Sequence, residues 1–151
     1  MRIRHASAAD IPDLMALEKR AATAAHWSKK QYETAFSDEL PYRVVLILEE
    51  EAGVQAFIAG RALDKEWEIE NIVVAAGARR RGFGTRLLEE FIDWARDRGA
   101  DTVFLEVRES NLAARRLYER WDFVEIGRRK RYHQEPEEDA IVYQFGFRRF
   151  A

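Results

Sequence analysis

Apolar and polar positions along this chain alternate between the two-residue period of strands and the 3.6-residue period of helices. The uninterrupted apolar run VVLIL within Tyr42–Glu50 predicts a strand that is buried on both faces. Glu51–Gly53 then predicts a hairpin turn into a second strand at Val54–Ala62. The clearest helix runs from Gly82 to about Arg98. Its apolar residues form one stripe at helical spacing: Leu87, Leu88, Phe91, Ile92 and Ala95.

Capping signals and turn residues locate the remaining elements. Two capping boxes, Ser7 with Asp10 and Ser28 with Gln31, open a helix through Glu18 and a short helix to about Phe36. The other predicted elements are strands at Arg2–His5, Trp67–Val74 and Thr102–Val107, a helix at Asn111–Trp121, and a closing hairpin of Phe123–Arg131 with Ala140–Phe147. The order β-α-α-β-β-β-α-β-α-β-β predicts one α/β domain over residues 1–151, with a mixed sheet.

Composition narrows the class of protein. A chain of 151 residues suits a single domain, and it has no apolar run of membrane-spanning length and no leading signal segment, so we expect a cytoplasmic protein. The absence of cysteine excludes disulfides, thiolate metal sites and a cysteine nucleophile. The three histidines lack the spacing of metal ligands, and the net charge of −2 gives no global attraction to nucleic acid.

The segment Ile69–Leu88, IENIVVAAGARRRGFGTRLL, predicts an anion site. It leads from a strand through a loop into a helix, whose first turn presents unpaired N–H groups and the positive end of the helix dipole. Gly82 and Gly84 allow a ligand to approach the backbone closely. Three arginines add positive charge at the mouth of the loop: Arg79, Arg80 and Arg81. A phosphate-bearing ligand fits this arrangement.

The common nucleotide fingerprints do not fit this loop. A P-loop requires Lys and then Ser or Thr after its second glycine, and the dinucleotide fingerprint requires a small residue where this chain has Leu87. A tight turn with solvated arginines remains an alternative. Binding of a nucleic acid strand is disfavoured, because no aromatic residues for base stacking accompany the arginines.

Four segments together resemble the GCN5-related N-acetyltransferases (GNAT), and within them the bacterial ribosomal-protein alanine N-acetyltransferases. Arg79-x-x-Gly82-x-Gly84 resembles the coenzyme A pyrophosphate loop of the superfamily. The other three segments resemble the subfamily: Trp27-Ser28, LEVRESN at Leu105–Asn111 with Tyr118 following, and RRKRYH with EDAIVY inside Arg128–Tyr143. Two positions depart from the pattern, because His26 replaces a usual proline and Asp122 replaces a usual glycine.

The resemblance implies a mostly antiparallel sheet flanked by helices, and acetyl-coenzyme A as co-substrate without a metal. It implies that the acceptor is the N-terminal α-amine of a protein, namely the N-terminal alanine of a ribosomal protein. The implied cofactor-binding residues are Ile72, Val73, Val74, Arg79, Arg80, Arg81, Gly82, Phe83, Gly84, Thr85, Asn111 and Tyr118. The implied acceptor-binding residues are Trp27, Glu70, Tyr132 and His133. We expect no direct contact with nucleic acid or membrane, and a monomer or weak dimer.

Acetyl transfer to an amine requires a base for the ammonium proton, donors for the oxyanion and a proton for the leaving thiolate. By resemblance Glu106 is the base, and burial in its apolar window would raise its pKa toward a useful value. Glu106 could instead face solvent, and Glu70 is an alternative base. Tyr118 resembles the family's general acid, although a core aromatic is the alternative. Asn111 could cap its helix as well as contact the pantetheine arm.

Several alternatives remain open at this stage. Basic residues 128–131 and the acidic run Glu135, Glu137, Glu138 and Asp139 form either a charged surface loop or a jaw around a protein N-terminus. The same chemistry could act on a lysine side chain or a small-molecule amine. A non-catalytic acyl-coenzyme A sensor is an alternative of another class, but such a module would need neither Glu106 nor Tyr118.

Overall fold

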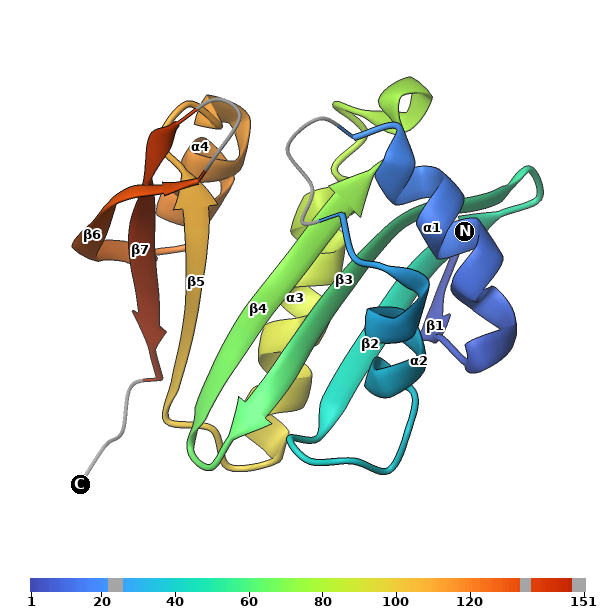
Figure 1. The fold of residues 1–151 in the computed structure, drawn as a ribbon, viewed down its shortest axis with the longest axis horizontal. Helices are drawn as coiled ribbons and strands as arrows, with labels where there is room; N and C mark the ends of the chain where they lie inside the picture. The colour runs from blue at the N-terminus through green and yellow to red at the C-terminus, as the bar shows by residue number, and fades with distance from the viewer. Residues whose placement is uncertain (22–25, 134–136, 148–151) are drawn as a thin grey trace.

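The computed structural model describes residues 1–21, 26–133 and 137–147. Within these residues the chain forms a seven-stranded sheet in the order β1-β2-β3-β4-β5-β7-β6 (Figure 1). The strands are β1 Arg2–His5, β2 Arg43–Glu50, β3 Gly53–Leu63, β4 Glu66–Val74, β5 Thr102–Arg108, β6 Val124–His133 and β7 Glu138–Gly146. The helices are α1 Ile11–Lys19, α2 Lys29–Ala35, α3 Phe83–Asp97 and α4 Leu112–Arg120, with 3-10 turns η1 Ala8–Asp10 and η2 Ala76–Ala78.

The predicted order of elements is confirmed, and so is the mostly antiparallel sheet flanked by helices. One difference lies at the first helix, where the Ser7 capping box opens the 3-10 turn η1 and α1 begins only at Ile11. Pro12 explains where α1 starts, since a proline without an N–H fits the first turn of an α-helix. Within the described residues no helix has the length and apolar character needed to cross a membrane.

Helices cover both faces of the sheet, with α3 behind it and α1 and α2 in front (Figure 1). The apolar run in β2 serves both layers. Val44, Leu46 and Leu48 pack in the core beneath α3, whereas Val45 and Ile47 pack in the core beneath α1 and α2. The expected burial of this strand on both faces is therefore confirmed.

The sheet opens between β4 and β5. These two strands are the parallel pair, and their ladder contains four residue pairs, from Glu66 with Thr102 to Ile69 with Leu105. Beyond Ile69, β4 continues to pair only with β3, while β5 continues to pair only with β7. The two strands diverge in Figure 1, and their facing edges carry backbone groups without a strand partner.

A β-bulge in β4 lies directly beside this opening. Gly60 of β3 pairs with Ile69, and Ala59 pairs with Asn71, so Glu70 has no residue opposite it. The extra residue reverses the alternation of β4. Ile69 packs in the core beneath α3, whereas Val73 packs in the core beneath α1 and α2.

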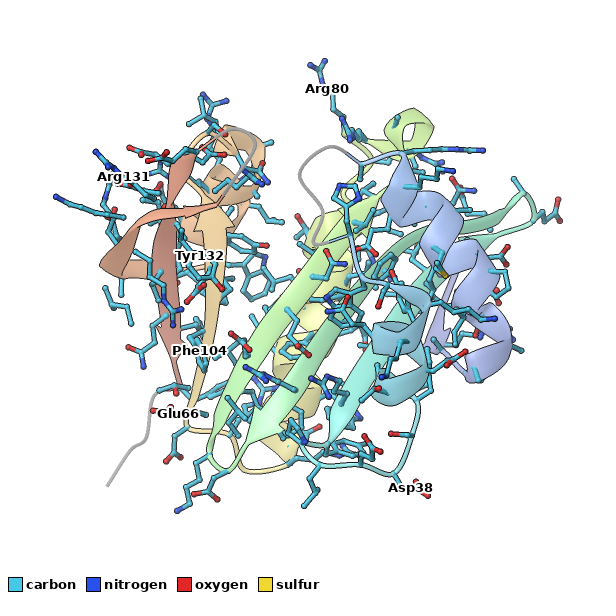
Figure 2. The ribbon with its side chains drawn as sticks, in the orientation of Figure 1. Asp38, Glu66, Arg80, Phe104, Arg131 and Tyr132 are labelled. Carbon is cyan, nitrogen blue, oxygen red and sulfur yellow. The ribbon has the colours of Figure 1, made fainter. Side chains whose placement is uncertain are left out.

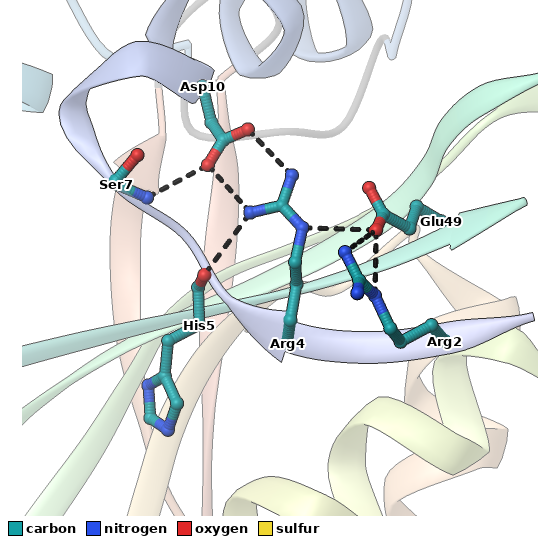
Figure 3. A network of polar contacts seen from close by, with 6 residues as sticks. All are labelled: Arg2, Arg4, His5, Ser7, Asp10 and Glu49. Carbon is teal, nitrogen blue, oxygen red and sulfur yellow. Dashed lines mark hydrogen bonds and ion pairs between the residues drawn. The ribbon is translucent and has the colours of Figure 1, made fainter.

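A salt-bridge network fixes the N-terminal strand to the start of the helical layer (Figure 3). Arg4 donates to both carboxylate oxygens of Asp10, at 3.0 and 2.9 Å, and its Nε lies 3.1 Å from Glu49. Arg2 donates to the same Glu49 at 2.6 Å, and the Ser7 N–H donates to Asp10 at 2.8 Å. The guanidinium of Arg4 lowers the pKa of Asp10, so the pair remains charged at neutral pH.

Glu18 ties α1 to the rest of the layer from a buried position. The residue is 2% exposed, and its carboxylate accepts hydrogen bonds from three segments of chain. Tyr32 of α2 donates its hydroxyl at 2.6 Å, Asn71 of β4 donates its amide at 2.6 Å, and Trp27 donates its backbone N–H at 2.9 Å. Three donors compensate the desolvation of a carboxylate that has no ion-pair partner among the described residues.

Glu18→Ala should lower the free energy of unfolding by about 3 kcal/mol, because it leaves buried donors without an acceptor. Urea unfolding followed by tryptophan fluorescence measures the change. Glu33→Ala is the matched control, since Glu33 lies on α2 with a side chain that is 57% exposed. Equal stabilities for the two variants would contradict the role assigned to Glu18.

Candidate active site

A cavity of about 500 Å³ fills the opening between β4 and β5. Its walls come from β3, β4, β5, α4, β6 and the segment before α2. Predicted site residues in its lining are Trp27, Glu70, Ile72, Glu106, Asn111, Tyr118 and Tyr132. Sequence reasoning did not single out four further polar residues there: Arg61, Glu68, Asn71 and Arg108. For Glu68 the sequence contained a signal, namely its spacing from Glu66 and Glu70, since alternate residues of a strand share a face.

Glu106 lies on the face of β5 that is turned away from α3. Val103, Leu105 and Val107 alternate with it and are buried in the core beneath α3. The Glu106 side chain is 17% exposed, and Arg129 Nε lies 2.8 Å from its Oε1. Burial raises its pKa, Arg129 lowers it and the charge of Glu68 raises it, with a net upward shift. A carboxylate with a raised pKa is suited to accept a proton near neutral pH.

Tyr118 enters the cavity from α4. The residue is 3% exposed and its ring packs near those of Phe123 and Tyr143, at centroid distances of 5.6 and 6.2 Å. Burial raises its pKa, so the phenol is neutral at physiological pH. Its hydroxyl makes no hydrogen bond to another described residue, whereas the Tyr143 hydroxyl donates to Glu119 and accepts from Arg115. Tyr118 is therefore a core aromatic whose hydroxyl remains available to a ligand.

The cavity joins the two faces of the sheet. Tyr118 belongs to the core on the α3 side, while Glu106 lies on the opposite face, and both residues line the same cavity. A ligand in the opening can thus meet a neutral acid from one side and a carboxylate from the other. This arrangement suits a reaction between two substrates that approach from opposite faces.

Asn111 caps α4 at the edge of the cavity. Its Oδ1 accepts a hydrogen bond from the backbone N–H of Ala114 at 3.2 Å. The predicted capping role is confirmed, and the position of Asn111 in the lining leaves its amide within the cavity wall.

Glu70, the alternative base, is held by two guanidinium groups. Arg43 Nε lies 3.0 Å and Arg61 Nε 3.9 Å from its carboxylate oxygens. Glu68 is paired in the same network, with Arg61 Nε at 2.6 Å. Both carboxylate oxygens of Glu70 thus lie beside guanidinium groups, whereas Glu106 has one ion-pair partner, Arg129, among the described residues.

The acceptor-side residues surround the front of the cavity. His26, which precedes Trp27, has a positive φ of 55°. The Trp27 ring packs edge-on against the ring of Tyr32, with 5.3 Å between the ring centroids. Tyr132 of β6 is 52% exposed and lines the cavity. The backbone of His133 ends β6, but its side chain lies outside the described residues.

The loop before α3 contains two residues in the left-handed conformation. Gly82 is the N-cap of α3 with φ +78°, and Arg80 also has a positive φ. Arg81 is bound to Glu50 at 2.7 and 2.8 Å, which partly neutralises its charge. Arg79 and Arg80 form no ion pair with other described residues, and Figure 2 shows Arg80 extending away from the loop.

Gly84 lies where α3, α4 and β4 meet. A Cβ at this position would make ordinary van der Waals contacts, 3.4 Å from Leu117 of α4 and 3.8 Å from Val74 of β4, so packing alone does not require glycine here. The turn after α4 forms although Asp122 replaces the usual glycine there, because Asp122 adopts the left-handed conformation with φ +64°.

The described carboxylates of the acidic run near the C-terminus form ion pairs with arginines. The three pairs are Glu137 with Arg131, Glu138 with Arg108 and Asp139 with Arg128. Glu135 lies outside the described residues. Figure 2 shows Arg131 at the outer side of β6. These pairs favour a charged surface over a jaw of free carboxylates. No group of described residues has the ligands to hold a metal ion.

Comparisons with known proteins agree with this geometry. The family model described as the acetyltransferase (GNAT) family matches residues 11–123. The chain is 37% identical over 138 residues to the [ribosomal protein bS18]-alanine N-acetyltransferase of Salmonella typhimurium, covering 90% of each protein. The crystal structure of the ribosomal-protein-S18-alanine N-acetyltransferase from Escherichia coli superposes with a TM-score of 0.87 at 30% identity, covering 99% of this chain and 96% of that one.

A more distant structure shows how general the fold is. Ard1 from Thermoplasma volcanium has a TM-score of 0.85 at 22% identity and covers 98% of each chain. At that level of identity the likeness concerns the fold alone.

Proposed function

As a member of the acetyltransferase (GNAT) family, this chain is an acyltransferase, and we propose that it transfers acetyl from acetyl-coenzyme A to the N-terminal α-amine of a ribosomal protein. The observation that carries the proposal is the cavity through the sheet, with Glu106 on one face and Tyr118 on the other. The relatives named for alanine acetylation of ribosomal protein bS18 support the choice of acceptor. Such an acceptor implies a cytoplasmic reaction.

Acetyl-coenzyme A would bind on the α3 side of the opening. Its pantetheine arm would pair with the edge of β4 at residues 72–74, as an added strand does, because this edge has lost β5 as a partner. The pyrophosphate would bind backbone N–H groups at residues 82–85, where the α3 dipole favours negative charge. Arg79 and Arg80 would add charge there, and Asn111 would contact the arm from the start of α4.

The acceptor amine enters from the face that carries Glu106. Glu106 takes a proton from the ammonium, directly or through a water, and the neutral amine attacks the thioester carbonyl. The backbone N–H of Val74 donates to the oxyanion of the tetrahedral intermediate. When that intermediate collapses, the C–S bond breaks and Tyr118 donates its phenolic proton to the departing thiolate. The second proton of the attacking nitrogen leaves through solvent and restores the phenol of Tyr118. Trp27 and Tyr132 shape the acceptor entrance, with Glu70 in its wall.

Incubation with acetyl-coenzyme A and a panel of peptides tests the proposal. The panel contains ribosomal-protein N-termini that begin with alanine, the same peptides with a blocked α-amine and an internal lysine, and a polyamine. We expect a mass gain of one acetyl group only on free N-termini, located by fragmentation. Acetylation of lysine or polyamine alone would transfer the assignment to another amine. Binding of acetyl-coenzyme A without any turnover would indicate a sensor module.

The base is tested by Glu106→Gln and Glu70→Gln. Glutamine retains shape and polarity but cannot accept the ammonium proton, so turnover should fall by about 10² in Glu106→Gln and much less in Glu70→Gln. Because the wild-type pKa of Glu106 is raised, activity should be lost as pH falls through a value above the usual glutamate range. Higher pH should partly restore Glu106→Gln, since bulk solvent then deprotonates the amine. Initial rates across pH measure this, and the reverse order of the two variants would assign the base to Glu70.

Tyr118→Phe separates the two roles of this residue. The substitution keeps the ring and its packing against Phe123 and Tyr143, so the fold should be retained. We expect turnover to fall by about 10² with unchanged acetyl-coenzyme A affinity, because the proton is needed only as the thiolate departs. Initial rates and calorimetric binding measure the two effects. An enzyme of near-normal turnover would reduce Tyr118 to its packing role.

A further inference from the structure

Arg129 of β6 is the counterion of Glu106. Its Nε lies 2.8 Å from Glu106 Oε1, and this is the one ion pair it forms with the described residues. The Arg129 side chain is 58% exposed, whereas that of Glu106 is 17% exposed. The guanidinium therefore reaches a mostly buried carboxylate from the solvent side, and it can leave that carboxylate without itself becoming buried.

A bulge in β6 gives Arg129 a second contact. Residues three apart on a regular strand point to opposite faces, but the Arg129 guanidinium lies 5.1 Å from the ring centroid of Tyr132. The register of β6 against β7 shifts between Arg129 and His133, and Arg131 has a positive φ of 54°. The irregularity turns Arg129 and Tyr132 to the same side, where Tyr132 lines the cavity.

The acceptor amine needs the position that Arg129 occupies. A protein α-amine is largely an ammonium at neutral pH, and it must reach hydrogen-bond distance of the base to lose its proton. We propose that Arg129 is a displaceable counterion of Glu106, which holds the carboxylate in the free enzyme, yields it to the acceptor ammonium and remains against the ring of Tyr132. The inference rests on the proposed acetyl transfer to an amine. Arg129 is thereby a positioning residue that acts through Glu106.

The other charged groups around the cavity already have partners. Arg61 binds Glu68 and Glu70, and Arg108 binds Glu138 at 3.0 Å. The titratable groups that share the lining with Glu106 are Glu68, Glu70, His26, Tyr118 and Tyr132. Of the cations around the cavity, Arg129 is the one paired with Glu106, so its removal should act on this carboxylate with little effect on the other pairs.

The first test needs no turnover. Titration of the Glu106 side-chain carboxyl by ¹³C NMR, assigned by its loss in Glu106→Gln, is carried out on wild type, Arg129→Gln and Arg129→Lys. Removal of the cation disfavours the charged carboxylate, so the midpoint should rise by about one pH unit in Arg129→Gln and much less in Arg129→Lys. Arg128→Gln is the matched control, because Arg128 lies on the same strand but pairs with Glu109 and Asp139. An unchanged midpoint in Arg129→Gln would overturn the proposal.

Kinetics test the displacement itself. The acid limb of kcat/KM should move upward with the NMR midpoint in Arg129→Gln. Above that limb the KM for the acceptor peptide should fall by about two- to fivefold with kcat retained, since no guanidinium competes with the ammonium. A higher acceptor KM there would show that Arg129 helps to bind the peptide and would refute displacement. Failure of wild type to acetylate any amine would refute the proposed function. The NMR titration distinguishes this outcome from a failure of the counterion proposal, because it needs no turnover.

Discussion

The early end of the parallel ladder between β4 and β5 is the constraint on which the site depends. After four residue pairs the strands separate, and each keeps its outer neighbour. Backbone groups along the facing edges then need partners, and an extended ligand arm can supply them. The same separation creates the cavity, admits Tyr118 from the α3 side and exposes Glu106 on the other face. A continuous ladder would pair these edges and close the path between the two substrates.

Two bulges lie in strands that contribute side chains to the cavity wall, β4 and β6. The one in β4 at Glu70 turns Ile69 and Val73 toward opposite cores, and thereby places Asn71 within reach of the buried Glu18 carboxylate. The one in β6 turns Arg129 and Tyr132 to one side. Both act locally, through one irregular residue or turn that changes where neighbouring side chains point. Regular strands around the same opening would present a different set of side chains.

These bulges also mark the limit of what the sequence could predict. Periodicity and capping residues predicted the elements, and the motif residues led to Glu106, Tyr118 and Gly82, because such signals are local in the chain. The sequence did not predict the ion pair between Arg129 and Glu106, or the hydrogen bond from the Trp27 backbone to the buried Glu18. These contacts depend on irregular register and join distant segments of the chain, and neither feature has a periodic signature. The sequence also could not distinguish Arg81 from Arg79 and Arg80, because only a spatial contact reveals that Arg81 is bound to Glu50.

Charges within the cavity favour binding of the acceptor ammonium before the proposed reaction and release of the amide product after it. The carboxylates of Glu68, Glu70 and Glu106 line it, while the guanidinium groups beside them hold Glu68 and Glu70 and leave Arg129 for Glu106. An incoming ammonium exchanges with Arg129, so one cation replaces another and the carboxylate stays compensated. Acetylation converts that ammonium into a neutral amide, which cannot form an ion pair. Once Glu106 has released its proton to solvent, Arg129 can return to it, and the product loses its strongest attraction to the site as the resting ion pair forms again.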